Sequence, residues 1–200
     1  MAFDFSQIKV SDPSRLHFGT GGIPLSTTQR STLNGIKQIH TLGLDALEME
    51  FVHSVNLNDE TAASLYALPS RSDTVLTCHG SYYINLNALE GVKRGASRSR
   101  ILQAADMCRK AGGWSVVFHA AYYMKLKEST VYATVKKQMT KLISELKDKG
   151  NGIWIRPETT GKVSQFGTLP EIIKLSQELD QVMPCVDFAH MHARSNGQEN

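Results

Sequence analysis

Short apolar runs alternate with amphipathic stretches along the chain. The runs are a few residues long and rich in β-branched residues, as buried strands are, whereas the stretches repeat apolar positions at helical spacing. The predicted strands cover residues 16–19, 46–52, 74–79, 114–119, 152–158 and 183–187. The predicted helices cover residues 27–42, 59–67, about 97–111, 129–149 and 169–179. This alternation predicts an α/β fold, with a parallel sheet covered by helices.

Two parallel architectures fit this alternation, an open doubly wound sheet and a closed barrel. The first turn holds Gly19-Thr20-Gly21-Gly22, but Pro24 stands where a dinucleotide-binding motif needs its third glycine. Polar residues at several strand ends favour the barrel, because its active sites lie at the carboxyl ends of the strands. We expect residues 1–200 to form a single (β/α)8 TIM barrel domain with about six of its βα units present. A full barrel usually needs about 250 residues, so we expect its C-terminal part to be missing.

The composition is that of a folded domain with an ordinary surface. Hydrophobic residues make up 41% and charged residues 20% of the chain, and the net charge of +3 permits a nucleic-acid partner without requiring one. Three cysteines without a Cys-x-x-Cys motif argue against a disulfide framework and a zinc knuckle. We see neither a signal peptide over residues 1–10 nor an apolar run near the ~18 residues of a membrane span. We therefore expect a cytoplasmic monomer with no membrane partner.

Histidines and carboxylates gather at the predicted strand ends. Five of the seven histidines lie at or just after such an end: His17, His53, His79, His119 and His190. Glu158 and Asp187 close the fifth and sixth strands. Imidazole nitrogens and carboxylate oxygens are good ligands for Zn²⁺ and Mn²⁺. A lone histidine is more often a packing residue, but this succession on neighbouring strands predicts a metal centre at the rim of the sheet.

The other histidines have less specific settings. His17 could simply stabilise the first turn, and His40 lies on a predicted helix face. If the segment after the sixth strand stays extended, His190 and His192 point the same way. One of them would then be a ligand and His192 would support it.

Four segments resemble the endonuclease IV family. The longest, His79-Gly80-Ser81-Tyr82-Tyr83-Ile84-Asn85-Leu86, is similar to the family's His-x-Ser-Tyr-x-Ile-Asn-Leu. The others follow in the family's order: Phe118-His119, Glu158-Thr159-Thr160-Gly161 and Cys185-Val186-Asp187-Phe188-Ala189-His190. The chain departs from the family at Ala120-Ala121-Tyr122, where Pro-Gly is usual, and over residues 48–53, which lack a Lys-Asn-type DNA-contacting loop. It resembles a divergent, archaeal-like branch of these xylose-isomerase-like barrels.

The resemblance implies a zinc-dependent AP endonuclease with up to three Zn²⁺ ions, for which Mn²⁺ could substitute. His79, His119 and Glu158 would hold one ion, Glu158 would bridge to a second ion bound by Asp187, and His190 would contribute to a third. The substrate would be double-stranded DNA with abasic sites, cut on the 5′ side of the lesion by zinc-activated hydroxide during base excision repair. Glu158 would orient the hydroxide, and Tyr82 would enter the DNA beside the lesion.

Two other functions stay open. Glu158 and Asp187 would also suit a sugar isomerase or epimerase with one divalent metal, and a catalytically inactive DNA-damage binding module is a third reading. A basic run follows Tyr82 and could meet a phosphate backbone or form a solvated helix start: Lys93, Arg94, Arg98 and Arg100.

Overall fold

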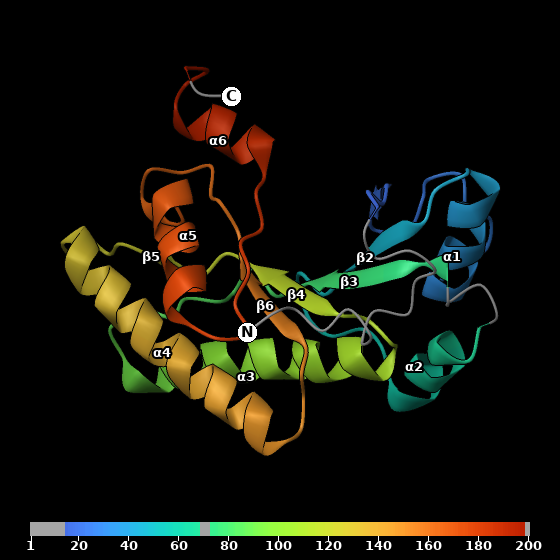
Figure 1. The fold of residues 1–200 in the computed structure, drawn as a ribbon, viewed down its shortest axis with the longest axis horizontal. Coiled ribbons are helices and arrows are strands. Elements are labelled where there is room, and N and C mark those ends of the chain that lie inside the picture. The colour runs from blue at the N-terminus through green and yellow to red at the C-terminus, as the bar shows by residue number, and fades with distance from the viewer. Residues whose placement is uncertain (1–14, 69–72, 199–200) are drawn as a thin grey trace.

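Five parallel strands form the centre of the molecule in this computed structural model, which describes residues 15–68 and 73–198 (Figure 1). The strands are β1 (Gly19–Gly21), β2 (Ala46–Glu50), β3 (Val75–His79), β4 (Ser115–Phe118) and β6 (Trp154–Pro157), hydrogen-bonded in that order. Every neighbouring pair is parallel, as the alternation of the sequence predicts. The fold is therefore α/β, and its strands follow the chain in the order of a (β/α) barrel.

Helices connect the strands and cover one face of the sheet. They are α1 (Thr32–Thr41), α2 (Asp59–Tyr66), α3 (Gly91–Lys110), α4 (Glu128–Asp148) and α5 (Leu169–Glu178). In Figure 1, α2, α3 and α4 lie below the sheet. Strand side chains alternate between the two faces, so Leu47 and Met49 of β2 join the core against the helices while Glu48 lies on the other face.

The core holds each strand in place. Leu47, Leu76, Val116 and Ile155 come from four neighbouring strands, and each is at most 1% exposed. Burying a side chain of this size contributes about 1.5–3 kcal/mol. The register fixed by this packing also fixes the polar residues at the strand ends.

The sixth predicted strand is interrupted. Residues 182–185 run parallel to β6, but they form isolated bridges, Ile155 with Val182 and Glu158 with Cys185. Ile155 N donates to Gln181 O at 3.0 Å and Thr159 N to Cys185 O at 3.0 Å. Pro157 stands midway between these two donors and has no N–H, which removes one hydrogen bond from the ladder.

Two element boundaries differ from the prediction near the N-terminus. β1 begins at Gly19, so His17 precedes the strand, and placing it at a carboxyl strand end was wrong. α1 begins at Thr32 because the Ser31 hydroxyl accepts a hydrogen bond from Asn34 N at 3.2 Å and caps the helix. Farther along the chain, α3 begins earlier than predicted, at Gly91, because glycines and cations obscure the apolar periodicity of its first turns.

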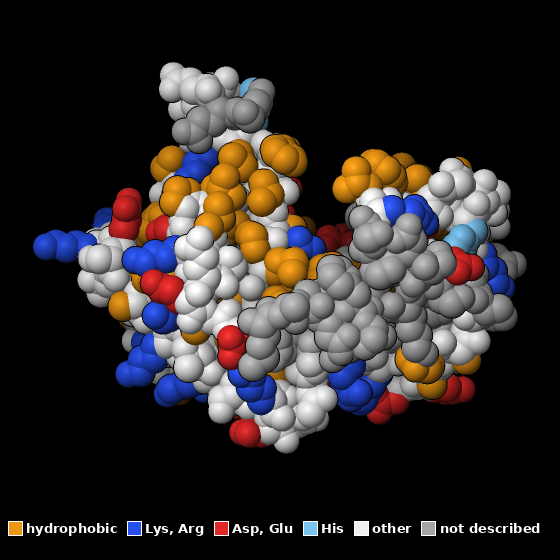
Figure 2. Space-filling model, viewed as in Figure 1, with side chains coloured by type: hydrophobic (Ala, Val, Ile, Leu, Met, Phe, Trp, Pro, Cys, Tyr) orange, Lys and Arg blue, Asp and Glu red, His pale blue; other side chains and the backbone are white. Residues whose placement is uncertain are grey.

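Three short elements were not predicted. β5 (Ala121–Tyr122) and β7 (Gln165–Phe166) form an antiparallel ribbon that joins the loops after β4 and β6, and α6 (Phe188–Arg194) follows the interrupted strand. Figure 2 shows a hollow between the part that carries α5 and α6 and the part that carries β1 and α1. Within residues 15–68 and 73–198, β1 pairs with β2 alone, and no helix is both long and apolar enough to cross a bilayer.

Candidate metal centre

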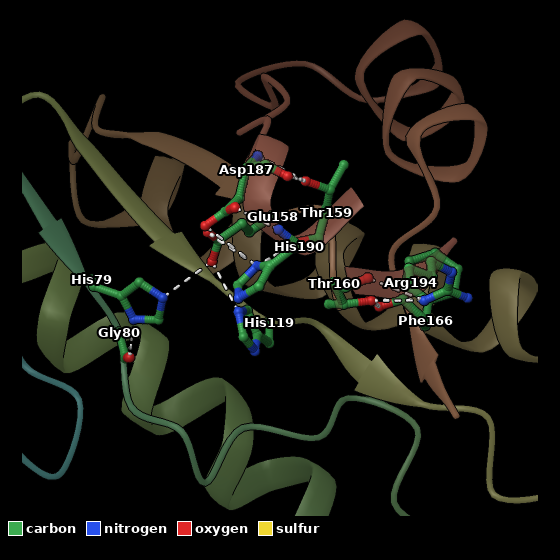
Figure 3. A network of polar contacts seen from close by, with 10 residues as sticks. All are labelled: His79, Gly80, His119, Glu158, Thr159, Thr160, Phe166, Asp187, His190 and Arg194. Atoms are coloured by element: carbon green, nitrogen blue, oxygen red, sulfur yellow. Dashed lines mark hydrogen bonds and ion pairs between the residues drawn. The ribbon is translucent and has the colours of Figure 1, made fainter. Parts of the chain in front are cut away.

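His79, His119 and Glu158 meet at the carboxyl ends of three neighbouring strands, β3, β4 and β6 (Figure 3). Glu158 Oε2 lies 3.1 Å from His79 Nε2 and 3.0 Å from His119 Nε2. One donor atom from each residue falls within 4.8 Å of the others, which is compatible with coordination of a single ion. The predicted convergence of these three residues is therefore present.

A second triad shares Glu158 with the first. Glu158, Asp187 and His190 also bring one donor atom each within 4.8 Å of the others. His190 Nδ1 lies 3.5 Å from Asp187 Oδ2 and 3.7 Å from Glu158 Oε1. The His119 and His190 rings are 5.1 Å apart, so the two triads are adjacent. All five residues expected as ligands are thus in one cluster.

Backbone carbonyls orient the imidazoles. His79 Nδ1 donates to Gly80 O at 2.7 Å. His190 Nδ1, the atom that lies near Asp187 and Glu158, is also 2.9 Å from Thr159 O, which keeps this ring beside the second triad. A hydrogen bond from one ring nitrogen fixes the tautomer and turns the other nitrogen towards a ligand. In His79 the nitrogen left for this role is Nε2, the atom that faces Glu158.

Charge is concentrated on the buried pair of His79 and Glu158. Burial opposes both charged forms, but the hydrogen bonds of His79 with Glu158 and Gly80 raise its pKa to about 9. Burial likewise opposes ionisation of Glu158, yet His119 and His79 lower its pKa to about 2. Glu158 is therefore a carboxylate at neutral pH, and without a metal His79 holds a proton against it.

His119 fits a metal in a different way. Its Nε2 atom is buried and lies near Glu158 Oε2, but the geometry is not that of a hydrogen bond, and this nitrogen has no other partner among the described residues. A buried polar atom without a partner is costly unless it binds something. Two imidazoles beside an ionised carboxylate match the donor preference of Zn²⁺ and Mn²⁺, so the residues present fit a divalent metal.

Asp187 has two roles in the second triad. Its Oδ1 atom accepts a hydrogen bond from His190 N at 2.7 Å and so caps α6, while Oδ2 faces the His190 ring. Thr159 holds Asp187 from behind, since its hydroxyl accepts from Asp187 N at 2.8 Å and donates to Asp187 O at 3.1 Å. The Asp-x-x-His spacing therefore places both ligands at one helix start.

The segment after Asp187 does not stay extended, so the condition for His190 and His192 to point the same way is not met. Residues 188–194 form α6, so His190 and His192 point to different sides of a helix. Gly161 permits the close packing of this helix, because a Cβ there would lie 3.3 Å from His190 Cδ2. Arg194 secures the helix further, with Nη1 donating to Thr160 Oγ1 at 3.0 Å and Lys162 O at 2.8 Å.

Tyr82 stands at the edge of the cluster. Its ring lies 5.5 Å from that of His79 and 6.4 Å from that of His119, and 53% of the residue is exposed. His53 packs against Tyr82 at 6.1 Å and is in neither metal triad. An exposed ring directly beside the ligands can contact whatever binds there.

The remaining histidines are structural. His17 Nδ1 lies 3.0 Å from Asp45 Oδ2, which accounts for the stabilising role considered for it. His40 Nε2 lies 2.8 Å from Thr74 Oγ1, and His40 is in neither metal triad.

Cys185 lies next to the site. Burial raises the pKa of its thiol to about 12, so the thiol stays protonated at neutral pH.

Two further acidic residues, Glu48 and Glu50 of β2, lie near the candidate metal centre and were not predicted as site residues. They line a cavity of about 590 Å³ together with Arg30 and the Gly21-Gly22 backbone. Burial raises the pKa of Glu48, and His79 and Glu158 are close enough to influence it. The sequence could have indicated these two residues, because Glu48 and Glu50 are two positions apart on a predicted strand and must therefore lie on the same face of the sheet.

A family comparison agrees with this geometry. Residues 36–200 match the model of the xylose isomerase-like TIM barrel family. The chain belongs to this family. An uncharacterized protein from the archaeon Methanocaldococcus jannaschii is 36% identical over 185 residues, which are 92% of this chain and 66% of that protein. The chain thus spans about two thirds of the length of this relative.

Two solved structures, of proteins named for different activities, are similar to the chain in fold. A D-tagatose 3-epimerase-like protein matches with a TM-score of 0.70 and 16% identity, over 88% of this chain and 67% of that one. Endonuclease IV from Thermus thermophilus matches with a TM-score of 0.66 and 19% identity, over 89% of this chain and 65% of that one. These likenesses establish the fold, a xylose isomerase-like TIM barrel present in part. The activity has to be argued from the residues of the site.

Proposed function

We propose that this chain carries the metal centre of a phosphodiesterase that cuts double-stranded DNA 5′ to abasic sites, as endonuclease IV does. The observation that carries the proposal is the sharing of Glu158 between two donor triads. A carboxylate in that position can bridge two ions, and paired ions suit the in-line displacement of a phosphodiester. An epimerase with one ion has no need for both His79 and His119.

The residues have separate roles in this mechanism. His79, His119 and Glu158 would hold one ion, Glu158 and Asp187 a second, and His190 would contribute to a third. Bound Zn²⁺ or Mn²⁺ would supply positive charge for the phosphate oxygens and would acidify a water molecule.

Glu158 acts in this mechanism as a ligand and orienting group. Its pKa of about 2 makes it too weak a base to take a proton by itself. The Gly80 carbonyl would keep His79 Nε2 turned towards an ion, because it engages the other ring nitrogen. Tyr82 would contact the DNA beside the lesion.

An incision assay tests the proposal. The substrate is a labelled duplex with one tetrahydrofuran abasic analogue, and an identical undamaged duplex is the control. We expect a nick on the 5′ side of the analogue that EDTA abolishes and that Zn²⁺ or Mn²⁺ restores. Binding of the damaged duplex without an EDTA-sensitive nick would contradict the proposal and favour a damage-binding module.

The cavity beside β2 favours one rival function, a sugar epimerase with a single divalent ion. Glu48 and Glu50 would repel phosphate groups, but their carboxylates could accept hydrogen bonds from sugar hydroxyls. Incubation with D-fructose in D₂O distinguishes the two, because epimerisation exchanges a carbon-bound proton for deuterium. Deuterium uptake that depends on one bound ion, without DNA incision, would replace the nuclease by the epimerase.

A further inference from the structure

A basic groove lies between α3 and α4, outside the candidate metal centre. Its volume is about 540 Å³, and four cationic side chains line it: Arg94, Arg98, Lys137 and Lys141. None of the described residues that line it is acidic. Figure 2 shows Lys and Arg side chains gathered over this part of α3 and α4, at the lower left of the view.

Most of this charge is not neutralised within the protein. Arg98 is the partial exception, since its Nε atom lies 3.4 Å from Glu145 Oε1 and its Nη1 atom donates to Gln138 Oε1 at 2.6 Å. In the described part of the chain, Arg94, Lys137 and Lys141 form no ion pair. At least three positive charges therefore face one concave surface without a counter-charge.

The placement of these cations opposes helix stability. The first turn of α3 has no acidic residue but contains Lys93 and Arg94, although positive charge is unfavourable at a helix N-terminus. Glu90, the residue before this turn, pairs with Lys93 at 2.7 Å and gives no side-chain cap. On α4, Lys137 and Lys141 are like charges one turn apart, which is also unfavourable. A bound anion would relieve both conflicts.

The guanidinium of Arg94 is already held in place. Its Nη1 atom donates to Ala88 O at 2.6 Å and Leu89 O at 2.9 Å. Both hydrogens of Nη1 are used in this way, so the guanidinium is held at the groove wall with its Nη2 and Nε groups left as donors for a phosphate oxygen. Less side-chain entropy is then lost when an anion binds.

We propose that this α3–α4 groove binds phosphate groups. They could belong to a free oligophosphate or to the backbone of a nucleic acid, which share the same charge and acceptor geometry. The first source is independent of the proposed function. The second rests on it, because the segment from Tyr82 to Arg94 links the metal centre to the groove, and Asn87 Nδ2 donates to Tyr122 O at 2.9 Å to fix this link.

Charge-matched double variants provide the test. Lys137→Ala with Lys141→Ala removes two groove cations from exposed helix positions, where alanine favours the helix. Lys37→Ala with Lys149→Ala removes the same charge elsewhere on the surface. Binding of inorganic pyrophosphate is measured by calorimetry, and binding of an undamaged duplex by fluorescence anisotropy over a range of salt concentrations. Amide NMR shifts locate the pyrophosphate.

We expect the groove variant to weaken pyrophosphate binding at least tenfold while the control variant stays within twofold. Shifts should cluster on the first turn of α3 and on residues 134–141. If the phosphates belong to nucleic acid, pyrophosphate should bind poorly to the unsubstituted protein. The groove variant should then weaken duplex binding and lower the slope of the logarithm of the duplex-binding constant against the logarithm of the salt concentration by about 2. Equal losses in the two double variants, or shifts confined to the metal centre, would overturn the proposal. If the unsubstituted protein binds phosphate in the groove but does not cut the abasic duplex, only the proposed nuclease function is contradicted.

Discussion

The Nε2 atom of His119 lies 3.0 Å from Glu158 Oε2 and is buried, yet it makes no hydrogen bond there. Two potential donor atoms this close together, with no hydrogen bond between them, form an arrangement that a shared cation would stabilise. Without a cation the contact leaves a buried polar atom unsatisfied. The five ligands are therefore arranged for an ion, and their individual roles can be separated by substitution.

Glu158→Gln should disrupt both triads, whereas Asp187→Asn should disrupt only the second. Loss of the shared carboxylate should weaken metal binding by more than about 100-fold, beyond the effect typical of supporting residues. Metal content after equilibrium dialysis against Zn²⁺ measures this, with the exposed Glu60→Gln as the control. Unchanged metal content in the Glu158 variant would show that the residue is not a ligand.

Metal binding at pH 7 should release a proton from His79. In the metal-free protein the pKa of His79 is about 9, raised from its ordinary 6.5, so the site is protonated until an ion displaces the proton. Below pH 9 the apparent affinity for the metal should then increase about tenfold for each unit by which the pH is raised. Calorimetry in buffers of different ionisation enthalpy counts the protons, and a count near zero would contradict this mechanism.

The same pair should make the stability of the metal-free protein depend on pH. The raised pKa of His79 stabilises the fold fully below pH 6.5, and this contribution is lost as the pH rises through about 9. The lowered pKa of Glu158 stabilises the fold above pH 4.5, and this contribution is lost as the pH falls through about 2. Urea unfolding in EDTA should show the largest contribution between pH 4.5 and 6.5. His79→Gln should flatten the alkaline side of this profile.

Gly161→Ala should disturb the second triad. The added methyl group would lie 3.3 Å from His190 Cδ2, so α6 and His190 must shift. We expect weaker binding of the ion to which His190 would contribute, measured by competition with a zinc-sensitive dye. Gly95→Ala is the matched control, because nothing lies within 4 Å of its Cβ. This control should leave the metals unchanged and stabilise α3 by about 0.5–1 kcal/mol.

Tyr82→Ala should separate metal binding from substrate binding. The ring stands at the exposed edge of the site and donates to no ligand, so metal content should match that of the unsubstituted protein. If the ring stacks beside an abasic site, kcat/KM for the tetrahydrofuran duplex should fall about tenfold or more. An unchanged kcat/KM would remove Tyr82 from the proposed interface.

The sequence predicted that the candidate ligands come together, because strand periodicity and parallel pairing determine where the strand ends meet. His79, His119 and Glu158 each follow a strand that the apolar pattern marks clearly. His190 and His192 were harder, since the choice between an extended segment and a helix depends on the cap that Asp187 provides. Glu48 and Glu50 had a visible alternation, but the cavity beside them forms only when α1 and β1 pack nearby.

Asp187 connects the chemistry of the site to the secondary structure that follows it. One of its oxygens caps α6, and the other faces the His190 ring in the second triad. Binding or loss of an ion at the second triad would therefore change the contacts of the residue that caps the first turn of α6. The order of the α6 surface would then differ between the metal-loaded and the metal-free protein.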